Sequence, residues 1–426
     1  MPGIEEQMTL IKRGAVEIIQ EDELKKKIAS SIKEKTPLTV KAGFDPTAAD
    51  IHLGHTVLLR KLKHFQELGH KVIFLIGDAT AIIGDPSGVS QTRKTLTYDE
   101  VEKNVKTYVS QVSKILDTNN SAVFQLQYNS QWFSNYRDTT KPPPFTFDQF
   151  VELAQRYTVA RLLERDDFQK RLKENKPISY LELFYPLMQG YDSVKLRSDV
   201  EIGGTDQKFN MLVGRSLQQT QGYDQKPQVV MTMPILEGLD GIQKMSKSLN
   251  NYIGINDKPK EMFGKVMSVS DEMMWKYYEL LTDEDTGRIK SGVAGGRIHP
   301  KQAKLDLARI ITAQYHDRHE AARQEREFER AFKEKGFPRD VKVEKIKADK
   351  FGKNFFTVPL ALVLIDGIHL FNSKSEFKRK VKEGAVEVNG RRITDINAEV
   401  PAGNEHKIRV GKKFKIVYII PPTSDY

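Results

Sequence analysis

Two histidines three residues apart, His52 and His55 in the segment HLGH, have a type and spacing that could support chemistry. Imidazole can ligate a metal, act as a general base or donate hydrogen bonds to a phosphate. Helical zinc-protease sites place their histidines four residues apart with a glutamate between them, and a zinc site needs further ligands. HLGH does not match that pattern. We therefore predict no metal site, which leaves helix capping and phosphate binding as alternatives.

The surroundings of HLGH favour the phosphate. Residues 36–47, TPLTVKAGFDPT, have β-branched residues before Gly43 and Asp45, which predicts a strand that ends in a turn. The segment after HLGH has apolar residues at helical spacing. The start of that helix offers free N–H groups and the positive end of its dipole to an anion. Gly54 lacks a side chain, so a phosphate or a base can approach the backbone closely.

A parallel sheet is predicted around these residues. KVIFLIGD (71–78) is a near-continuous apolar run, as expected of a strand buried on both faces. Together with the preceding strand and helix it forms a βαβ unit, which implies a sheet of the α/β class. Ligands bind such sheets beyond the carboxyl ends of the strands, where the loops AGFDPT and IGDATAIIGDPSG (76–88) belong. Neither loop has the glycine pattern of a dinucleotide site or a phosphate loop.

Helices are expected over most of the remaining chain. Residues 1–35 are charged and have a helical pattern, and residues 98–220 are mainly helical in pattern with a proline-rich break at 139–145. QVVMTMPIL (228–236) is strand-like. Residues 301–332 form one amphipathic stretch.

The composition excludes several kinds of site. The 426 residues suggest two to four domains, and the absence of cysteine excludes disulfides, thiolate metal sites and a cysteine nucleophile. No segment resembles a secretory signal. The most apolar run, 358–368, is too short to span a bilayer and contains Asp366. We therefore expect a cytoplasmic protein that does not enter a membrane.

The last fifth of the chain carries most of the net positive charge. The net charge is +10, and residues 341–426 hold 17 Lys/Arg against 10 Asp/Glu. We expect a charged linker at 341–354 and a small basic α/β module at 355–426. Such a module either binds a polyanion or presents a solvated basic face.

A second motif far downstream complements HLGH. KMSKS (244–248) combines two lysines with two hydroxyls after the flexible segment EGLDG, and lysines are mobile charges that suit a polyphosphate. KMSKS alone could be an ordinary surface loop. An HxGH after the first strand and a KMSKS about 190 residues later are together a specific pair.

With these motifs the chain resembles a class I aminoacyl-tRNA synthetase, and more closely a bacterial-type tyrosyl-tRNA synthetase. GFDPTAADIHLGH, IGDPSG, YPLMQGYDSV, IGGTDQKFN and KMSKSLNNYIG resemble the blocks of that family, in its order, over essentially the whole chain. The resemblance implies a Rossmann-like, doubly wound parallel sheet, then a helical domain and a small α/β domain of the S4 type. It also implies that tyrosine attacks the α-phosphate of ATP and that tyrosyl then passes to the 3′-terminal adenosine of tRNA(Tyr).

The resemblance also implies the ATP site. ATP would arrive with Mg²⁺ as a substrate complex, with no tightly bound cofactor. The catalytic residues would be His52 and His55 at the phosphates and Lys244 and Lys247 at the departing pyrophosphate. Neither step needs an enzyme nucleophile, because this chemistry depends on positioning and charge stabilisation. The implied ATP-binding residues are Gly43, Asp45, Thr47, His52, Gly54, His55, Gly204, Asp206, Lys244, Met245 and Lys247.

The tyrosine pocket is implied in the same way. The implied tyrosine-binding residues are Asp85, Tyr185, Gln189, Asp192, Gln207 and Lys41. Tyr185, Gln189 and Asp192 have helical spacing, so they share one face of a helix. Asp192 matches the carboxylate that accepts the hydrogen bond of the substrate phenol. Lys41 departs from the family, many members of which have tyrosine there. It either pairs with a pocket carboxylate or points elsewhere from the strand end.

Domains and partners complete what the resemblance implies. A catalytic domain at 1–258 would contain a helical dimer-interface insertion around 120–180, and a tRNA-contacting helical domain would span 259–340. The protein would form a homodimer, which the proline-rich segment 139–145 could decorate unless it is a neutral insertion. The RNA-binding residues of the terminal module would be Lys374, Lys378, Arg379, Lys380 and Lys382.

Three other interpretations account for part of the sequence. A small-molecule nucleotidylyltransferase would also use HxGH, but it would explain only the region around the first two predicted strands. A tryptophan-specific synthetase is closer, although Asp192 and the basic tail argue against it. A synthetase-derived RNA-binding protein without catalysis would not need intact histidines in HLGH and lysines in KMSKS.

Overall fold

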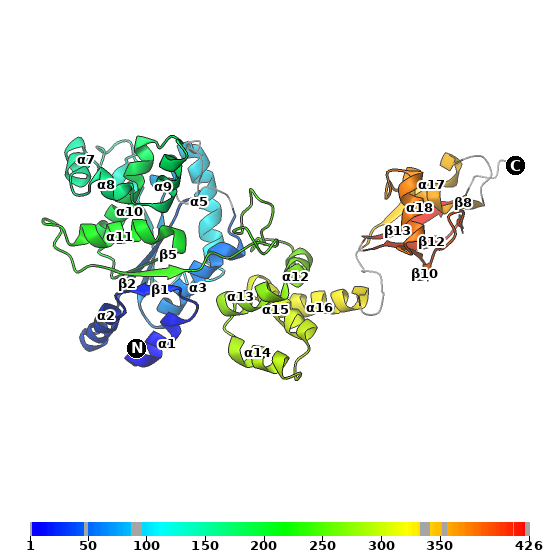
Figure 1. The fold of residues 1–426 in the computed structure, drawn as a ribbon, viewed down its shortest axis with the longest axis horizontal. Helices are drawn as coiled ribbons and strands as arrows, with labels where there is room; N and C mark the ends of the chain where they lie inside the picture. The colour runs from blue at the N-terminus through cyan, green and yellow to red at the C-terminus, as the bar shows by residue number, and fades with distance from the viewer. Residues whose placement is uncertain are drawn as a thin grey trace. The chain divides into compact units, whose positions relative to one another are not determined.

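Short apolar strands form a mixed sheet at the centre of the first of two units, Met1–Ala321 and Ala322–Tyr426. The computed structural model describes residues 2–46, 50–86, 96–332, 341–351, 356–411 and 413–421. The described strands of the first unit pair in the order β1-β6-β5-β2-β3-β4 (Figure 1). Their bounds are β1 (Glu17–Ile19), β2 (Thr39–Phe44), β3 (Lys71–Ile76), β4 (Phe124–Tyr128), β5 (Val200–Gly204) and β6 (Val229–Met233).

The sheet is parallel except at its edge, where β1 pairs antiparallel with β6. β2 and β3 pair in parallel over their full lengths, and β5 lies on the other side of β2. The strand order therefore runs outward from β2 to β4 and resumes on the opposite side at β5. This is the doubly wound topology that the sequence predicts, and its switch point lies between β2 and β5, where ligands bind in such folds.

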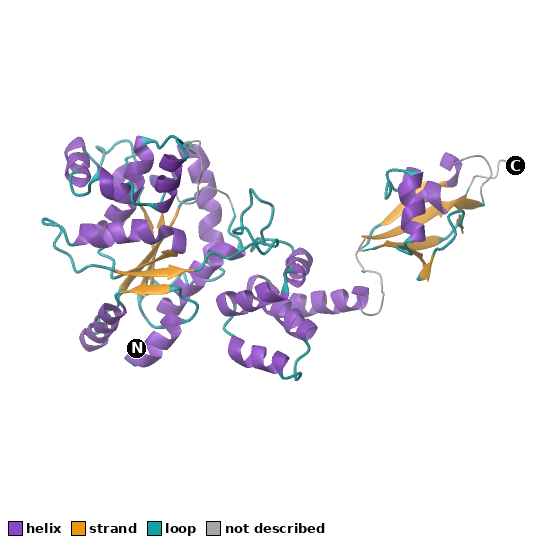
Figure 2. Ribbon diagram, viewed as in Figure 1, coloured by secondary structure: helices purple, strands orange, loops and turns teal. Residues whose placement is uncertain are grey.

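Helices cover both faces of the sheet, with α10 and α11 on one face and α1 to α3 on the other (Figure 1). Beyond the sheet, α12 to α15 form a helical region in which α12 and α13 pack on α15 (Figure 2). The helices are α1 (Ile4–Lys12), α2 (Glu21–Glu34), α3 (Leu53–Glu67), α4 (Thr80–Ile83), α5 (Tyr98–Val112), α6 (Ser130–Phe133), α7 (Phe147–Ala154), α8 (Val159–Leu162), α9 (Asp166–Lys173), α10 (Tyr180–Leu196), a 3₁₀ turn η1 (Thr205–Gln207), α11 (Lys208–Gln218), α12 (Pro259–Ser268), α13 (Asp271–Leu281), α14 (Thr286–Ala294), α15 (Pro300–Tyr315) and α16 (Arg318–Phe332). No helix within the described ranges is both long and apolar enough to cross a membrane.

Three strands of this sheet were not expected from the sequence. The expectation of a helix over 1–35 is wrong, because Gly14 and Gln20 adopt φ angles of 65° and 70° and separate α1, β1 and α2. β4 and β5 lie within 98–220, which is otherwise mainly helical. Their sequences, FQLQY and VEIGG, are short and contain polar residues or glycine, so they show no apolar run.

The amphipathic stretch predicted over 301–332 is two helices rather than one. α15 ends at Tyr315, and His316 has an extended backbone with φ −126° and ψ −157°. The side chain of Asp317 then accepts the backbone N–H of Glu320 over 2.6 Å, as an N-cap does. A capping residue has thus divided one continuous apolar pattern into two helices.

The second unit is rich in strands (Figure 2). Its described part has a five-stranded sheet, β10-β9-β12-β13-β7, and a two-stranded sheet, β11-β8. β7 pairs in parallel with β13, so the segment expected to be a linker, 341–354, instead contributes a strand to this sheet. The elements are β7 (Val343–Lys347), η2 (Ala348–Phe351), β8 (Thr357–Pro359), α17 (Leu360–Leu362), the π-helical turn η3 (Val363–Gly367), α18 (Lys374–Lys382), β9 (Val386–Val388), β10 (Arg391–Arg392), β11 (Glu399–Pro401), β12 (Glu405–Val410) and β13 (Lys413–Ile420).

Two glycines allow α10 and α11 to pack closely. A Cβ atom built on Gly190 would lie 2.9 Å from Cδ1 of Leu217 and 3.0 Å from the backbone nitrogen of Gly214. A Cβ atom on Gly214 would lie 2.7 Å from Oγ of Ser193. Real Cβ atoms do not approach other atoms this closely, so the two glycines set the position of α10 over the sheet.

We predict that Gly190→Ala lowers the free energy of unfolding by about 1–3 kcal/mol, because the added methyl group overpacks the contact between α10 and α11. Gly264→Ala is the matched control, since Gly264 also lies inside a helix but a Cβ atom there meets nothing within 4 Å. Its expected effect is a gain of about 0.5–1 kcal/mol from helix propensity. Urea unfolding measures both variants, and equal effects would contradict the role given to the close packing.

Candidate active site

HLGH lies at the start of α3, where His52 is the N-cap residue. The backbone N–H of His52 donates to Nδ1 of His55 over 3.2 Å, and the two rings stack with their centroids 3.9 Å apart. Nδ1 of His52 is buried without a hydrogen-bond partner among the described residues. Capping and ligand binding are therefore not exclusive: one imidazole caps the helix, and the other keeps a ring nitrogen without a protein partner.

Burial lowers the pKa of both imidazoles. Desolvation is the main cause for His55, whose pKa falls to about 4, and the charge of Lys247 lowers it further. Desolvation also lowers the pKa of His52, with the charges of His55 and Lys247 as smaller causes. Both rings are therefore neutral at pH 7, so each has one N–H donor to offer to a phosphate.

The chain around KMSKS packs against HLGH. The backbone N–H of Leu53 donates to the carbonyl of Ile253 over 2.9 Å, just downstream of KMSKS. A Cβ atom on Gly54 would lie 3.0 Å from the ring of His52 and 3.5 Å from Cβ of Met245. The structure thus brings together two motifs that are about 190 residues apart, as their pairing in the sequence predicts.

The two lysines of KMSKS have different surroundings. Lys247 forms an ion pair with Asp50, directly before Ile51-His52, and its ammonium lies 5.8 Å from the ring centre of Tyr252. Lys244 is exposed, and its charge lowers the pKa of Asp206. Both ammonium groups therefore lie at the rim of the site rather than in its interior. Thr47, a predicted ATP-binding residue, lies outside the described residues.

Asp45 joins the predicted ATP site to the predicted tyrosine site. One carboxylate oxygen accepts a hydrogen bond from the hydroxyl of Tyr185 over 2.7 Å, and the other accepts one from the hydroxyl of Thr80 over 2.8 Å. Gly43 lies just upstream, in β2. A side chain at Gly77 would collide with Asp45, so the end of β3 must come close to this loop.

A second group of predicted residues meets beyond β5. The side-chain amide of Gln207 donates to Asp85 over 2.6 Å, and that of Asn210 donates to Gln189 over 2.9 Å and to Gln207 over 3.2 Å. Desolvation raises the pKa of Asp206, and the nearby carboxylate of Asp85 raises it further.

The next residue of this group is Gly204, where a side chain would collide with the carboxylate of Asp206. The close packing at Gly204 holds that carboxylate at the end of β5. Asp85, Gln189, Gln207, Gly204 and Asp206 therefore share the carboxyl edge of the sheet.

Asp192 is buried, with 3% of its surface exposed. The indole N–H of Trp132 donates to it over 2.8 Å, and the side-chain amide of Asn129 lies 3.4 Å from its other oxygen. Desolvation raises the pKa of Asp192 to about 7, and the charge of Lys41 is the largest influence that opposes the shift. Asp192 is thus a buried carboxyl group that titrates near neutral pH.

Lys41 does pair with a buried carboxylate, that of Glu201 in β5, with Nζ 3.0 Å from Oε1. The side chains of successive strand residues alternate between faces, so Lys41 points to the α10 face of the sheet while Val40 and Ala42 point away from it. Of the two alternatives left by the sequence, the structure favours a partner within the pocket region.

Several polar residues of this site were not predicted. Asn129 and Trp132 directly follow β4, and the amide of Asn129 also donates to Thr80 over 3.0 Å. Asn210 and Glu201 connect the remaining groups. If β4 is recognised as a strand, the segment NSQW that follows it belongs at the carboxyl edge of the sheet. Its Asn and Trp are then candidates for the site.

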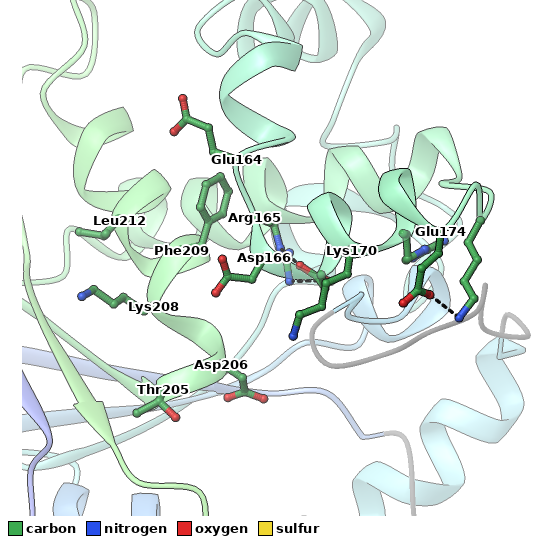
Figure 3. Close-up of a pocket in the computed structure, with 13 residues that line it drawn as sticks. Glu164, Arg165, Asp166, Lys170, Glu174, Thr205, Asp206, Lys208, Phe209 and Leu212 are labelled. Carbon is green, nitrogen blue, oxygen red and sulfur yellow. Dashed lines mark hydrogen bonds and ion pairs between the residues drawn. The ribbon is translucent and has the colours of Figure 1, made fainter.

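A cavity of about 650 Å³ lies beside the predicted site, between α9 and the start of α11 (Figure 3). Among its described lining residues, Asp206 is the one predicted from the sequence. The lining also includes Lys170, Lys208 and Asp166, so charges of both signs face the cavity. Phe209 and Leu212 add an apolar side.

The predicted RNA-binding residues share α18 in the second unit, whose buried face consists of Phe377 and Val381. Lys374, Lys378, Arg379 and Lys382 are exposed. Lys380 forms an ion pair with Glu383 at 2.6 Å, and Arg379 lies 3.8 Å from the same carboxylate. The helix therefore presents a basic face to solvent.

Comparison with known proteins agrees with this geometry. Residues 33–333 match the model of the family "tRNA synthetases class I (W and Y)". The tyrosine–tRNA ligase of Desulfotalea psychrophila is 49% identical over 97% of this chain and 98% of its own length. That of Oleidesulfovibrio alaskensis is 51% identical over 96% of this chain and 98% of its own length.

Solved structures share the fold. A tyrosyl-tRNA synthetase from Archaeoglobus fulgidus, solved with L-tyrosine, matches with a TM-score of 0.59 and 24% identity over 76% of this chain and all of its own. A truncated mitochondrial tyrosyl-tRNA synthetase from Aspergillus nidulans matches with a TM-score of 0.61 and 21% identity over 78% of this chain and 95% of its own. The chain therefore belongs to the class I tRNA synthetases of the tryptophan and tyrosine family.

Proposed function

We propose that the protein is a tyrosine–tRNA ligase of the cytoplasm. It forms tyrosyl-adenylate and pyrophosphate from L-tyrosine and ATP, and then transfers the tyrosyl group to the 3′-terminal adenosine of tRNA(Tyr). The observation that carries the proposal is the link through Asp45, which joins the loop before HLGH to Tyr185 on the helix of Asp192. The residues proposed for the phosphates and those proposed for the amino acid would thereby form one continuous site at the switch point of the sheet.

In the first step, a carboxylate oxygen of tyrosine would attack the α-phosphorus of ATP, and pyrophosphate would leave. Neutral His52 and His55 would donate hydrogen bonds to the phosphates, and Lys244 and Lys247 would neutralise the charge that grows on the leaving group. Lys247 must exchange Asp50 for the phosphate to do so. Because both partners of that ion pair are partly exposed, the exchange costs little.

The remaining ATP-site residues would bind the nucleotide itself. Gly43, Gly54 and Gly204 would let the base and ribose approach the backbone, Asp206 would bind the ribose, and Met245 would pack beside Gly54. The described residues contain no group of three or more His, Asp or Glu side chains placed to hold a metal ion. We propose that Mg²⁺ enters as part of the ATP complex, since Mg²⁺ commonly binds through substrate phosphates.

The other end of the cleft would bind tyrosine. Asp85, Tyr185, Gln189 and Gln207 would surround the α-amino group and carboxylate, and Asp192 would accept the phenol hydrogen. Phenylalanine would desolvate this carboxylate further without supplying a donor of its own, which explains why tyrosine would be preferred. The same carboxylate disfavours the apolar edge of tryptophan's six-membered ring, which argues for tyrosine within the family.

Domain roles follow from the same proposal. Residues 1–258 would form the catalytic domain, and 259–340 a helical domain that contacts tRNA. The terminal unit would be an RNA-binding module of the S4 type, which includes β7 as well as the expected range 355–426. Its basic helix α18 would bind phosphates of the tRNA.

We predict that ATP–pyrophosphate exchange by the purified protein depends on tyrosine, with phenylalanine and tryptophan at least about 100-fold less efficient, because Asp192 is buried and needs a donor. The measurement compares kcat/KM for the three amino acids against a reaction without amino acid. Exchange with tryptophan instead would keep the family and overturn the pocket. Exchange with none of them would favour an RNA-binding protein without catalysis.

We predict that replacing Lys374, Lys378 and Lys382 together by alanine weakens tRNA binding and lowers the slope of log affinity against log salt by about 2–3. These three lysines have no ion-pair partner among the described residues. Lys380→Ala is the matched control, because Lys380 already pairs with Glu383 and should change the slope less. Tyrosine-dependent exchange should be unchanged in both variants, and its loss in the triple variant would point to a folding role for α18.

A homodimer is proposed from a set of exposed apolar side chains, here called the patch, that fall in one stretch of the chain. Thirteen large hydrophobic side chains are exposed among the described residues, and six of them fall in one short stretch of the chain. That stretch lies in or next to the range 120–180 expected to form the dimer interface. The six are Phe147, Val151, Val159, Leu172, Tyr180 and Leu181. Clusters of this kind commonly mark protein interfaces.

We predict that sedimentation velocity gives the mass of two chains and that Phe147→Asp with Val151→Asp gives the mass of one, because buried carboxylates oppose association. Val16→Asp is the control, since Val16 is also exposed but lies outside the patch. A monomeric wild-type protein, or a dimer that survives the double substitution, would contradict this interface.

A further inference from the structure

The ion pair of Lys41 and Glu201 is unusual for its burial. Lys41 is 0% exposed and Glu201 is 2% exposed, and both lie beneath the part of α10 that carries Gln189 and Asp192. Nζ of Lys41 also lies 3.4 Å from the carbonyl of Gln189. A buried ion pair seldom stabilises a fold more than apolar side chains of the same volume would. Stability therefore does not explain why the chain has charged residues at these two positions.

Glu201 fixes the position of the lysine. Besides Lys41, its carboxylate accepts hydrogen bonds from the amide of Gln189 over 3.3 Å, from the hydroxyl of Ser193 over 2.9 Å and from the amide of Gln228. These donors come from α10 and from the residue just before β6. A carboxylate held from several sides cannot follow its partner elsewhere, so the ammonium group of Lys41 stays at one place next to α10.

The hydrogen-bond partners of Asp192 are neutral, and the charged groups that act on it lie on the side of Lys41 and Glu201. Trp132 and Asn129 donate to it from the segment after β4, and both are uncharged. Tyr185 on the same helix stays protonated, because burial and nearby carboxylates raise the pKa of its phenol well above 10. The charged groups that influence Asp192 most are Lys41 from β2, which lowers its pKa, and Glu201 from β5, which raises it by less.

We propose that Lys41 is a positioning residue for tyrosine specificity, whose charge, fixed by Glu201, favours the carboxylate form of Asp192 that accepts the phenol hydrogen of the substrate. The inference rests on the proposed function and gives Lys41 a role within it. With phenylalanine, an ionised Asp192 would keep only the neutral donors Trp132 and Asn129 and would lose its remaining water, which is costly for a buried carboxylate, whereas a protonated acid in the same place loses less. Selectivity for tyrosine therefore depends on the ionised form of Asp192.

The test uses variants that keep side-chain volume: Lys41→Met, Glu201→Gln and the double variant. In ATP–pyrophosphate exchange, kcat/KM for tyrosine should fall as the pH decreases through about 7, because Asp192 is ionised above its pKa and protonated below it. Removal of Lys41 raises that pKa, so the acid limb of the profile moves to higher pH. The expected order of the midpoint, from low to high pH, is Glu201→Gln, wild type, double variant, Lys41→Met.

At neutral pH the ratio of tyrosine to phenylalanine efficiency should fall about fivefold in the double variant for a midpoint shift of about one pH unit, because the ionised fraction of Asp192 at pH 7 then drops from about one half to about one tenth. Lys41→Met leaves Glu201 buried without its cation and can fail to fold. The double variant removes both charges together and avoids that defect, and Glu201→Gln shifts the limb in the opposite direction. The order of midpoints can thus be tested without Lys41→Met.

Two controls separate this role from a structural one. Asp192→Asn cannot ionise, so its profile should lack the acid limb. Arg171→Met with Glu182→Gln neutralises another buried pair, with side chains 2% and 7% exposed, and should lower stability without moving the limb. A folded double variant of Lys41 and Glu201 with an unchanged limb and ratio would overturn the inference. No tyrosine-dependent exchange in the wild type would instead overturn the proposed function.

Discussion

Buried carboxylates at the carboxyl edge of the parallel sheet are the constraint on which the rest of the structure depends. Asp78, Asp192 and Glu201 are almost fully buried, and each must be surrounded by donors, because an unpaired buried charge costs several kcal/mol or more. Asp78 accepts hydrogen bonds from Ser130, Tyr136 and Arg137. Those bonds fix the segment after β4, and the same segment carries the donors of Asp192.

Two lysine–carboxylate pairs show how burial decides what a charge can do. The pair of Lys247 and Asp50 lies at the rim, where water screens both charges and a phosphate can replace the carboxylate. The pair of Lys41 and Glu201 lies in the interior, where neither partner can be exchanged. On the proposed function, the same chemistry would thus give a mobile cation for the leaving pyrophosphate and a fixed cation beside the tyrosine pocket.

The parts of the site that the sequence predicts are those whose residues are neighbours in the chain or belong to a motif. HLGH, KMSKS and the helical face of Tyr185 and Asp192 could be located in this way, and so could the βαβ unit around β2 and β3. Asn129, Trp132 and Glu201 could not, because their roles depend on β4 and β5. Those strands are short and carry no apolar run, and only their pairing with β3 and β2 places their ends beside Asp192.

The charge balance of the pocket completes the argument for tyrosine. Glu201 and Lys41 together carry no net charge, although Lys41 influences Asp192 more, so ionised Asp192 leaves one negative charge in a desolvated place, where Trp132 and Asn129 supply neutral donors. The free pocket is therefore held in a state that lacks a strong donor. A phenol supplies that donor without adding a charge, whereas a benzene ring removes the remaining water and supplies nothing. On this account, selectivity comes from the unfavourable free energy of binding the wrong substrate. Part of the desolvation of Asp192 has already taken place on folding, because the charges of Lys41, Glu201 and Asp192 are buried together.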